Sequence, residues 1–192
     1  PDLPFHDPLA SRVFESLCGD SSAFSCAELR ATAFRTAVVD WLVQHFYARV
    51  GPRAVGVGLW SILGTRSHRI GSLPWIDVDA PEVAAFRREL LPERLGWLQI
   101  GTCLCNGSWL TAVCGHARRK LLFVLDESIL PLRQDALTQF LDDVSRQAQA
   151  GSELILAFDA HTPLRPARPL QRSSALELAI PDSSGASTLI RY

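Results

Sequence analysis

The segment that most constrains the fold of this chain is residues 53–83, where two short apolar runs lie on either side of a polar turn and short helix. In the first run, residues 54–59, apolar side chains alternate with glycines, and this pattern is typical of a buried strand. The second run, residues 74–78, carries Asp77, and Pro81 then stands where a helix begins. A carboxylate near the tip of a second strand predicts a doubly wound α/β sheet that holds a nucleoside at its switch point.

The rest of the chain alternates predicted helices with predicted strands. The helices are expected over 7–18, from Ser25 to Gly51, and over 81–91, 108–114 and 133–149. Further strands are expected near 97–101, 120–125 and 153–158, with a closing antiparallel pair at 176–180 and 188–192. This alternation predicts a mostly parallel sheet with right-handed crossovers.

Length and composition predict a single domain. The chain has 192 residues, of which 47% are hydrophobic, so it has enough apolar side chains for a sizeable core. We divide the domain into a helical preface over 1–52, an α/β core over 53–159 and a C-terminal segment over 160–192. Within the core, the continuous apolar run Leu121–Leu125 predicts a central strand that is covered on both faces.

Several short motifs occur in order along most of the chain. They are H-D-P-L-A at 6–10, F-R-T at 34–36 followed by Asp40, T-R-S-H-R-I at 65–70, W-I-D-V-D-A-P-E-V at 75–83, W-L at 109–110 and the segment 123–132. This order resembles the leucine carboxyl methyltransferase and polyketide O-methyltransferase family of S-adenosylmethionine-dependent enzymes. The resemblance implies a Rossmann-like class I methyltransferase fold with a shortened C-terminal segment. It also implies S-adenosylmethionine as cofactor and methyl transfer to a carboxylate or hydroxyl of a small metabolite.

The resemblance further implies which residues contact the cofactor. Asp77 falls at the position that accepts hydrogen bonds from the ribose, and Arg35 or Arg66 at positions that face the methionine carboxylate. Simpler alternatives are open: Asp77 as a solvated or helix-capping carboxylate, Arg66 in a surface ion pair, and Arg35 packed along its apolar stem. The catalytic residues stay unassigned, since a carboxylate acceptor needs no general base, and no metal site is expected.

The predicted cofactor loop departs from the family pattern. Where the family has Gly, Ala, Gly and Asp, this chain has Trp60, Ser61, Ile62 and Gly64. The family glycines let the backbone turn tightly against the methionine part of the cofactor. A tryptophan and an isoleucine would fill that space, unless Gly56 and Gly58 make the turn in a shifted register.

Two positions further along the chain also differ from the family. Cys103 stands at the acidic position expected to contact the adenine, and Asp126 stands where the fourth-strand segment of the family begins with glutamate. The candidate cofactor-binding residues are therefore Arg35, Gly56, Gly58, Arg66, Asp77, Cys103 and Asp126.

These matches and departures leave two hypotheses. The first is an active S-adenosylmethionine-dependent O-methyltransferase with a rebuilt cofactor loop. The second is a non-catalytic, pseudoenzyme relative that has lost the cofactor and binds a protein partner or another ligand. The first hypothesis requires open space above Gly56–Gly64, whereas the second predicts that Trp60 plugs it.

Charge and cysteine content narrow the partners and the compartment. The formal net charge of −1, with dispersed basic residues, predicts no nucleic-acid partner. Five cysteines without C-x-x-C spacing predict reduced thiols that pack as small hydrophobic side chains. No stretch is typical of a secretion signal or a membrane span. We therefore expect a cytoplasmic protein whose partner is a small-molecule acceptor or another protein, without membrane contact.

Overall fold

The computed structural model describes residues 6–17, 25–103, 107–115, 119–126, 134–159, 174–178 and 187–191. The helices in these ranges are α1 (Pro8–Leu17), α2 (Cys26–Val50), α3 (Arg66–Arg69), α4 (Pro81–Leu90), α5 (Ser108–Cys114) and α6 (Gln134–Gln147), with a 3-10 turn, η2 (Gly51–Arg53). The strands are β1 (Ala54–Leu59), β2 (Trp75–Asp79), β3 (Trp97–Gly101), β4 (Lys120–Asp126), β5 (Glu153–Asp159), β6 (Ser174–Leu178) and β7 (Ser187–Arg191). The predicted helices and strands are confirmed, with ends that agree to about two residues.

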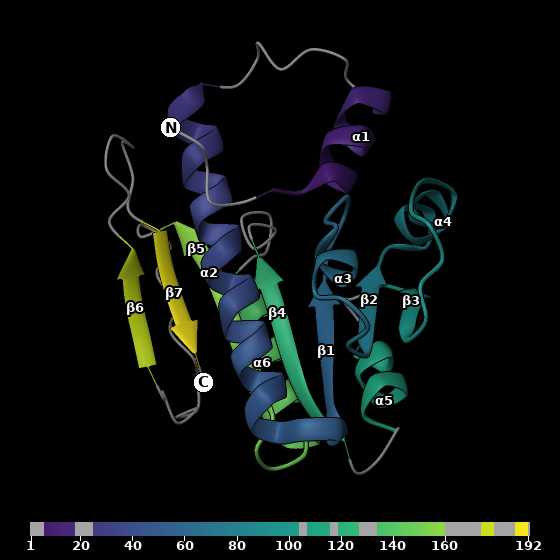
Figure 1. The fold of residues 1–192 in the computed structure, drawn as a ribbon. Helices are drawn as coiled ribbons and strands as arrows, with labels where there is room; N and C mark the ends of the chain where they lie inside the picture. The colour runs from purple at the N-terminus through teal and green to yellow at the C-terminus, as the bar shows by residue number, and fades with distance from the viewer. Residues whose placement is uncertain are drawn as a thin grey trace.

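The strands form one seven-stranded sheet in the order β3-β2-β1-β4-β5-β7-β6 (Figure 1). Strands β1 to β5 pair in parallel, and β7 pairs antiparallel with both β5 and β6. The chain runs from β1 outward to β3 and then returns to the other side of β1 as β4. This order confirms the predicted doubly wound, mostly parallel sheet and places its switch point between β1 and β4.

Helices cover both faces of the sheet. One buried cluster joins β1 and β4 to α5 and α6, with the rings of Phe123 and Trp109 in edge-to-face contact. The other cluster joins the same strands to α2 through Leu122 and Phe46. The five residues Leu121–Leu125 are each at most 4% exposed and alternate between the two clusters. The predicted central strand is therefore covered on both faces, as expected.

Helix α2 extends beyond the sheet that it covers. Its 25 residues span about 37 Å, whereas the 6 residues of β1 span about 20 Å. The C-terminal half of α2 packs on the sheet through Val39, Val43 and Phe46. The same face continues at helical spacing past the strand tips with Leu29, Thr32, Ala33 and Thr36. None of the described helices, α2 included, has the length and apolar content needed to cross a membrane.

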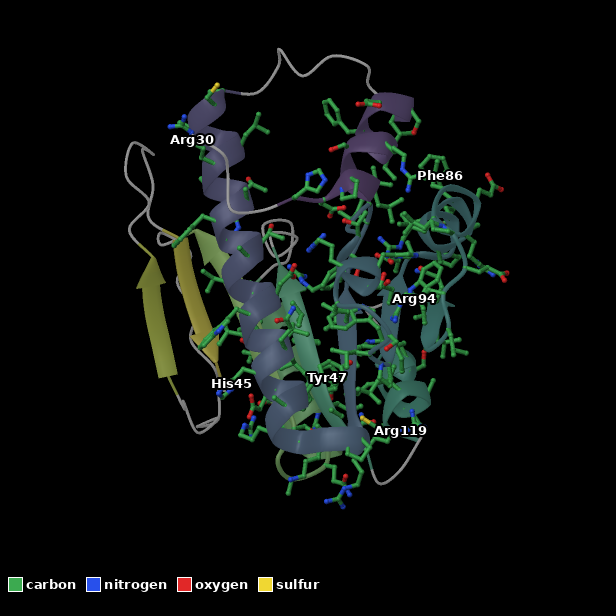
Figure 2. The ribbon with its side chains drawn as sticks, viewed as in Figure 1. Arg30, His45, Tyr47, Phe86, Arg94 and Arg119 are labelled. Carbon is green, nitrogen blue, oxygen red and sulfur yellow. The ribbon has the colours of Figure 1, made fainter. Side chains whose placement is uncertain are left out.

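Tyr47 ties α2 to the sheet near the end of the helix that is remote from α1 (Figure 2). Its hydroxyl donates to the carbonyl of Pro74 and accepts the N–H of Gly56 at 2.6 Å. Burial raises the pKa of Tyr47, so the hydroxyl keeps the proton that it donates. This contact fixes the C-terminal half of α2 on β1, and the N-terminal half then projects over the carboxyl ends of the strands.

Candidate functional site

A cavity of about 600 Å³ opens at the carboxyl ends of β1 and β4. Leu59, Asp77 and Val124 line it from the sheet, and Ala10 lines it from α1. Figure 1 shows that α1 and the N-terminal end of α2 both lie beyond the strand tips. Polar side chains that also line the cavity are Thr32, Thr36, Ser61, Thr65, Arg66 and Arg69. The cavity thus has the size of a ligand site and lies where doubly wound sheets bind ligands.

The loop after β1 keeps a glycine-like backbone without the glycines. Trp60 has φ of 49° and Ile62 has φ of 46°, in the left-handed region that glycine adopts freely. These are the two positions at which the family that the sequence resembles has glycine. Each non-glycine residue there costs on the order of 1–3 kcal/mol. The Ile62 side chain is 50% exposed, so burial of that side chain offsets little of the cost.

Trp60 does not plug the cavity. Its side chain is partly buried against the core cluster under α5 and α6, and it forms part of the cavity wall. The space that the non-catalytic hypothesis expects to be filled is therefore open. The larger side chains of the loop are accommodated around the cavity rather than inside it.

Gly56 and Gly58 lie inside β1 and are buried. They pair in register with Trp75 and Asp77 of β2. A Cβ on Gly56 would overlap the ring of Trp75, and one on Gly58 would lie 2.5 Å from Asp77 Oδ1 and Ser61 Oγ. Both glycines make room for groups on the neighbouring strand, and neither lines the cavity. The chain turns only after β1 ends, so the shifted register considered above is not adopted.

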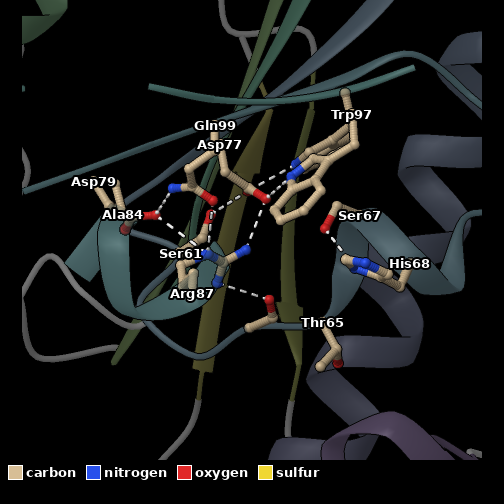
Figure 3. A network of polar contacts seen from close by, with 12 residues as sticks. Ser61, Thr65, Ser67, His68, Asp77, Asp79, Ala84, Arg87, Trp97 and Gln99 are labelled. Atoms are coloured by element: carbon tan, nitrogen blue, oxygen red, sulfur yellow. Dashed lines mark hydrogen bonds and ion pairs between the residues drawn. The ribbon is translucent and has the colours of Figure 1, made fainter. Parts of the chain in front are cut away.

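The buried carboxylate of Asp77 accepts four hydrogen bonds (Figure 3). Oδ1 accepts from Ser61 Oγ at 2.6 Å and from Trp75 Nε1 at 2.8 Å. Oδ2 accepts from Arg87 Nη2 at 2.7 Å and from Trp97 Nε1 at 2.8 Å. Four donors fill the acceptor positions of a carboxylate, so the alternative of a solvated Asp77 is wrong. Ser61 is the donor among these that lines the cavity, so a ligand hydroxyl would reach Oδ1 by replacing Ser61 Oγ.

Arg87 of α4 lies behind the loop and is 0% exposed. Its Nη1 donates to the carbonyls of Ile62 at 2.7 Å and Gly64 at 2.9 Å, and its Nε donates to Gln99 Oε1 at 3.1 Å. Asp79, the last residue of β2, lies 3.6 Å from Arg87 Nε and accepts the N–H of Ile62 at 3.0 Å. Burial raises the pKa of Asp79, against the opposing effect of the Ile62 N–H and Arg87. The sequence pattern does not indicate that Arg87 is buried behind the loop, because arginine in a helix is seldom fully buried.

A second network joins the preface to the short helix α3. Arg66 Nε donates to Asp40 Oδ1 at 2.7 Å, and Arg69 Nε donates to Asp40 Oδ2 at 2.8 Å. Arg69 Nη1 and Thr65 Oγ1 both donate to Asp7 Oδ2. The three N-terminal motifs of the resemblance therefore meet in one cluster of ion pairs at the edge of the cavity. The Arg66 side chain is 13% exposed, so its ion pair is not the surface pair considered above.

Replacing Asp7 with alanine is expected to lower the free energy of unfolding by about 2 kcal/mol at pH 7, because Asp7 caps α1 and its own buried carboxylate pairs with partly buried Arg69. Burial alone would raise the pKa of Asp7, but hydrogen bonds from Thr65, the Ala10 N–H and Arg69 outweigh it and lower the pKa. The stabilisation is therefore present above the ordinary aspartate range and is lost as the pH falls through the lowered value.

Urea unfolding at pH 7 and at about pH 3 checks this expectation. The difference between wild type and Asp7→Ala should shrink at the lower pH. Glu15→Ala, an exposed acidic position on the same helix, should change stability little at either pH. A difference for Asp7→Ala that is the same at both pH values would contradict the assignment.

The other predicted contacts lie away from the cavity or have side chains outside the described residues. Arg35 is half-buried on α2 and does not line the cavity. Cys103 is exposed just after β3 and is disulfide-bonded, so the expectation of reduced thiols is wrong for this residue. Asp126 ends β4 at the carboxyl edge, but its side chain is outside the described residues. Their roles in cofactor binding stay predictions.

Comparisons with known proteins agree with the fold. No protein-family model matches the chain. The chain is 33% identical over 163 residues to the tetracenomycin polyketide synthesis O-methyltransferase TcmP of Streptomyces glaucescens. This match covers 82% of the chain and 58% of TcmP, so the chain spans little more than half the length of that relative.

Solved structures of similar fold include two methyltransferase-like proteins. The N-methyltransferase NodS of Bradyrhizobium japonicum WM9, in complex with S-adenosyl-L-homocysteine, matches with a TM-score of 0.55 and 10% identity, over 96% of this chain and 97% of NodS. A methyltransferase-like protein from Thermobifida fusca matches with a TM-score of 0.58 and 16% identity, over 100% of this chain and 97% of that protein. These likenesses show the class I methyltransferase fold.

Proposed function

We propose that this chain, a homologue of the O-methyltransferase TcmP with the class I methyltransferase fold, binds S-adenosylmethionine in the cavity at the carboxyl ends of β1 and β4. We further propose that it transfers the methyl group to a carboxylate or hydroxyl oxygen of a small metabolite. The observation that carries the proposal is the position of the cavity at the switch point of the sheet. The adjoining loop supports it, since Trp60 and Ile62 take glycine-like conformations where the family has glycine.

The residues around the cavity suit this cofactor. The volume of about 600 Å³ is within the roughly 300–1,000 Å³ typical of small-molecule sites. The amino-acid end of S-adenosylmethionine is zwitterionic, and the charged residues Asp7, Arg66 and Arg69 line the wall. These residues are ion-paired within the cluster that includes Asp40, so the ligand would share or replace those pairs. Trp60 and Val124 offer apolar surface for the base.

To bind the ribose of the cofactor, the site must rearrange. Asp77 lines the cavity, but Ser61 Oγ already occupies the cavity side of its carboxylate at 2.6 Å. We assign Ser61 as the donor that a ribose hydroxyl replaces on Asp77 Oδ1. The other three donors to Asp77 do not line the cavity, so they would hold the carboxylate in place during the exchange.

When bound, the cofactor supplies an electrophilic methyl group on a sulfonium. The protein's part is to hold the acceptor oxygen in line with that methyl group and to exclude water. A carboxylate acceptor carries its own negative charge, so no side chain has to remove a proton from it. The open cavity favours this function over the non-catalytic alternative, which depends on Trp60 filling the space.

Calorimetric titration with S-adenosylhomocysteine tests the proposal. The wild-type protein should bind with micromolar affinity. Thr36→Trp, which places a large side chain on the cavity face of α2, should weaken binding by at least about tenfold. Ala48→Trp, at an exposed position of the same helix, should bind as the wild type does. No heat from folded wild-type protein would overturn the proposed function.

A further inference from the structure

Arg87 is a fully buried arginine that reaches from α4 to the backbone of the cofactor loop. One nitrogen, Nη1, donates to two loop carbonyls, those of Ile62 and Gly64. We propose that Arg87 is a positioning residue, which holds the 60–64 loop in the shape that cofactor binding needs and so replaces the glycines that the loop lacks. This inference rests on the proposed function for its link to the cofactor.

The loop needs such a support because two of its residues have unfavourable backbone conformations. Trp60 and Ile62 both have positive φ, and a β-branched residue such as isoleucine rarely adopts it. Left alone, the loop would relax toward ordinary φ values and redirect its carbonyl groups. Hydrogen bonds at 2.7 Å and 2.9 Å from Arg87 oppose that relaxation at the carbonyls of Ile62 and Gly64. The Ile62 N–H is held from the other side by Asp79 at 3.0 Å.

The position of Arg87 is itself set by the sheet (Figure 3). Its Nη2 pairs with Asp77 Oδ2 at 2.7 Å, and its Nε donates to Gln99 Oε1 at 3.1 Å and lies 3.6 Å from Asp79 Oδ2. Asp77 and Asp79 belong to β2 and Gln99 to β3, so the guanidinium plane is anchored to two strands. The loop carbonyls of Ile62 and Gly64 therefore take their position from the sheet through the side chain of Arg87.

If Arg87 served only as a counterion, any positively charged side chain would suffice at this position. The side chains of Arg87, Asp77 and Asp79 are each at most 2% exposed, so a positive charge is needed beside the two carboxylates. Lysine supplies that charge but has no planar fork to hold two carbonyls and Gln99 at once. Arg87→Lys therefore separates the two roles, because it keeps the counterion and removes the support of the loop.

A double-mutant cycle between Arg87→Lys and Ile62→Gly tests the proposal. S-adenosylhomocysteine affinity is measured by calorimetry for wild type, both single variants and the double variant, and the urea midpoint is measured for the same four proteins. Arg87→Lys should weaken binding about tenfold. Ile62→Gly should bind at least as well as wild type, because glycine adopts positive φ without support. The double variant should recover to within about threefold of Ile62→Gly.

Arg88→Lys is the matched control, since Arg88 is the exposed neighbour on α4 and, among the described residues, bonds only within its own helix through Nε to the Ala84 carbonyl. It should change neither affinity nor midpoint. If Arg87→Lys does not fold, Gln99→Met takes its place in the cycle, because it keeps the charge of Arg87 and removes the acceptor of Arg87 Nε, together with the hydrogen bond from Gln99 Nε2 to Asp79 Oδ2. The expected loss is then about threefold, again recovered by Ile62→Gly.

The outcomes separate this inference from the proposed function. Equal loss of affinity from Arg87→Lys with isoleucine or glycine at position 62 would overturn the positioning role. If folded wild-type protein binds no S-adenosylhomocysteine, the proposed function fails. In that case the urea midpoints by themselves test whether Arg87 supports the loop. A smaller loss of midpoint from Arg87→Lys in the glycine background supports it, and additive losses overturn it.

Discussion

Asp77→Ala is expected to lower the free energy of unfolding by about 3–5 kcal/mol. Asp77 is 1% exposed, and its carboxylate accepts from Ser61, Trp75, Arg87 and Trp97. Alanine would leave the Arg87 guanidinium with Asp79 as its only carboxylate partner among the described residues, and it would leave both indole N–H groups without their acceptor.

Urea unfolding monitored by circular dichroism measures this change. Glu89→Ala, an exposed acidic position on α4, is the control and should alter the free energy of unfolding by less than about 0.5 kcal/mol. A loss below about 1 kcal/mol for Asp77→Ala would mean that the four donors find other partners. The expected loss also means that weaker cofactor binding by Asp77→Ala would not by itself identify a ribose contact.

Gly56→Ala is expected to lower the free energy of unfolding by about 3 kcal/mol, because the new Cβ would overlap the ring of Trp75. Trp75 is 1% exposed and donates to Asp77, so it has little room to move and a hydrogen bond to lose. A matched control is Gly101→Ala at the end of β3, where the added Cβ would lie 3.1 Å from Pro81 Cα. That substitution should cost less than about 1 kcal/mol.

The same pair of variants distinguishes packing from cofactor binding at Gly56. Thermal and urea unfolding report the stability of each variant. If Gly56→Ala keeps wild-type stability but loses affinity for S-adenosylhomocysteine, the glycine contacts the cofactor and the packing account is contradicted.

The fold could be predicted from the sequence because local patterns specify it. The alternation in residues 54–59 and the continuous apolar run Leu121–Leu125 depend only on which faces of a strand are buried, and both are confirmed. Helix α2 ends just before Gly51 and Pro52, whose conformational preferences act over a few residues and are visible in the sequence. Patterns of this kind need no knowledge of distant partners.

The contacts of the site could not be predicted in the same way. Asp7, Asp40 and Arg69 were visible in the motifs, but their ion pairs form between segments far apart in the sequence. Arg87 gave no local signal, because its burial depends on two carboxylates of β2 and on the loop above it. The positive φ of Trp60 and Ile62 could not be predicted for the same reason, since tertiary contacts override the backbone preference of these residues.

A crystal structure of the protein grown with saturating S-adenosylhomocysteine tests the central claim most directly. The ligand should lie in the cavity between the loop after β1 and the N-terminal half of α2. Its ribose should replace Ser61 Oγ on Asp77, and its amino-acid end should face Asp7, Arg66 or Arg69. A ligand bound elsewhere, or an empty cavity at saturating concentration, would contradict the assignment of this cavity as the cofactor site.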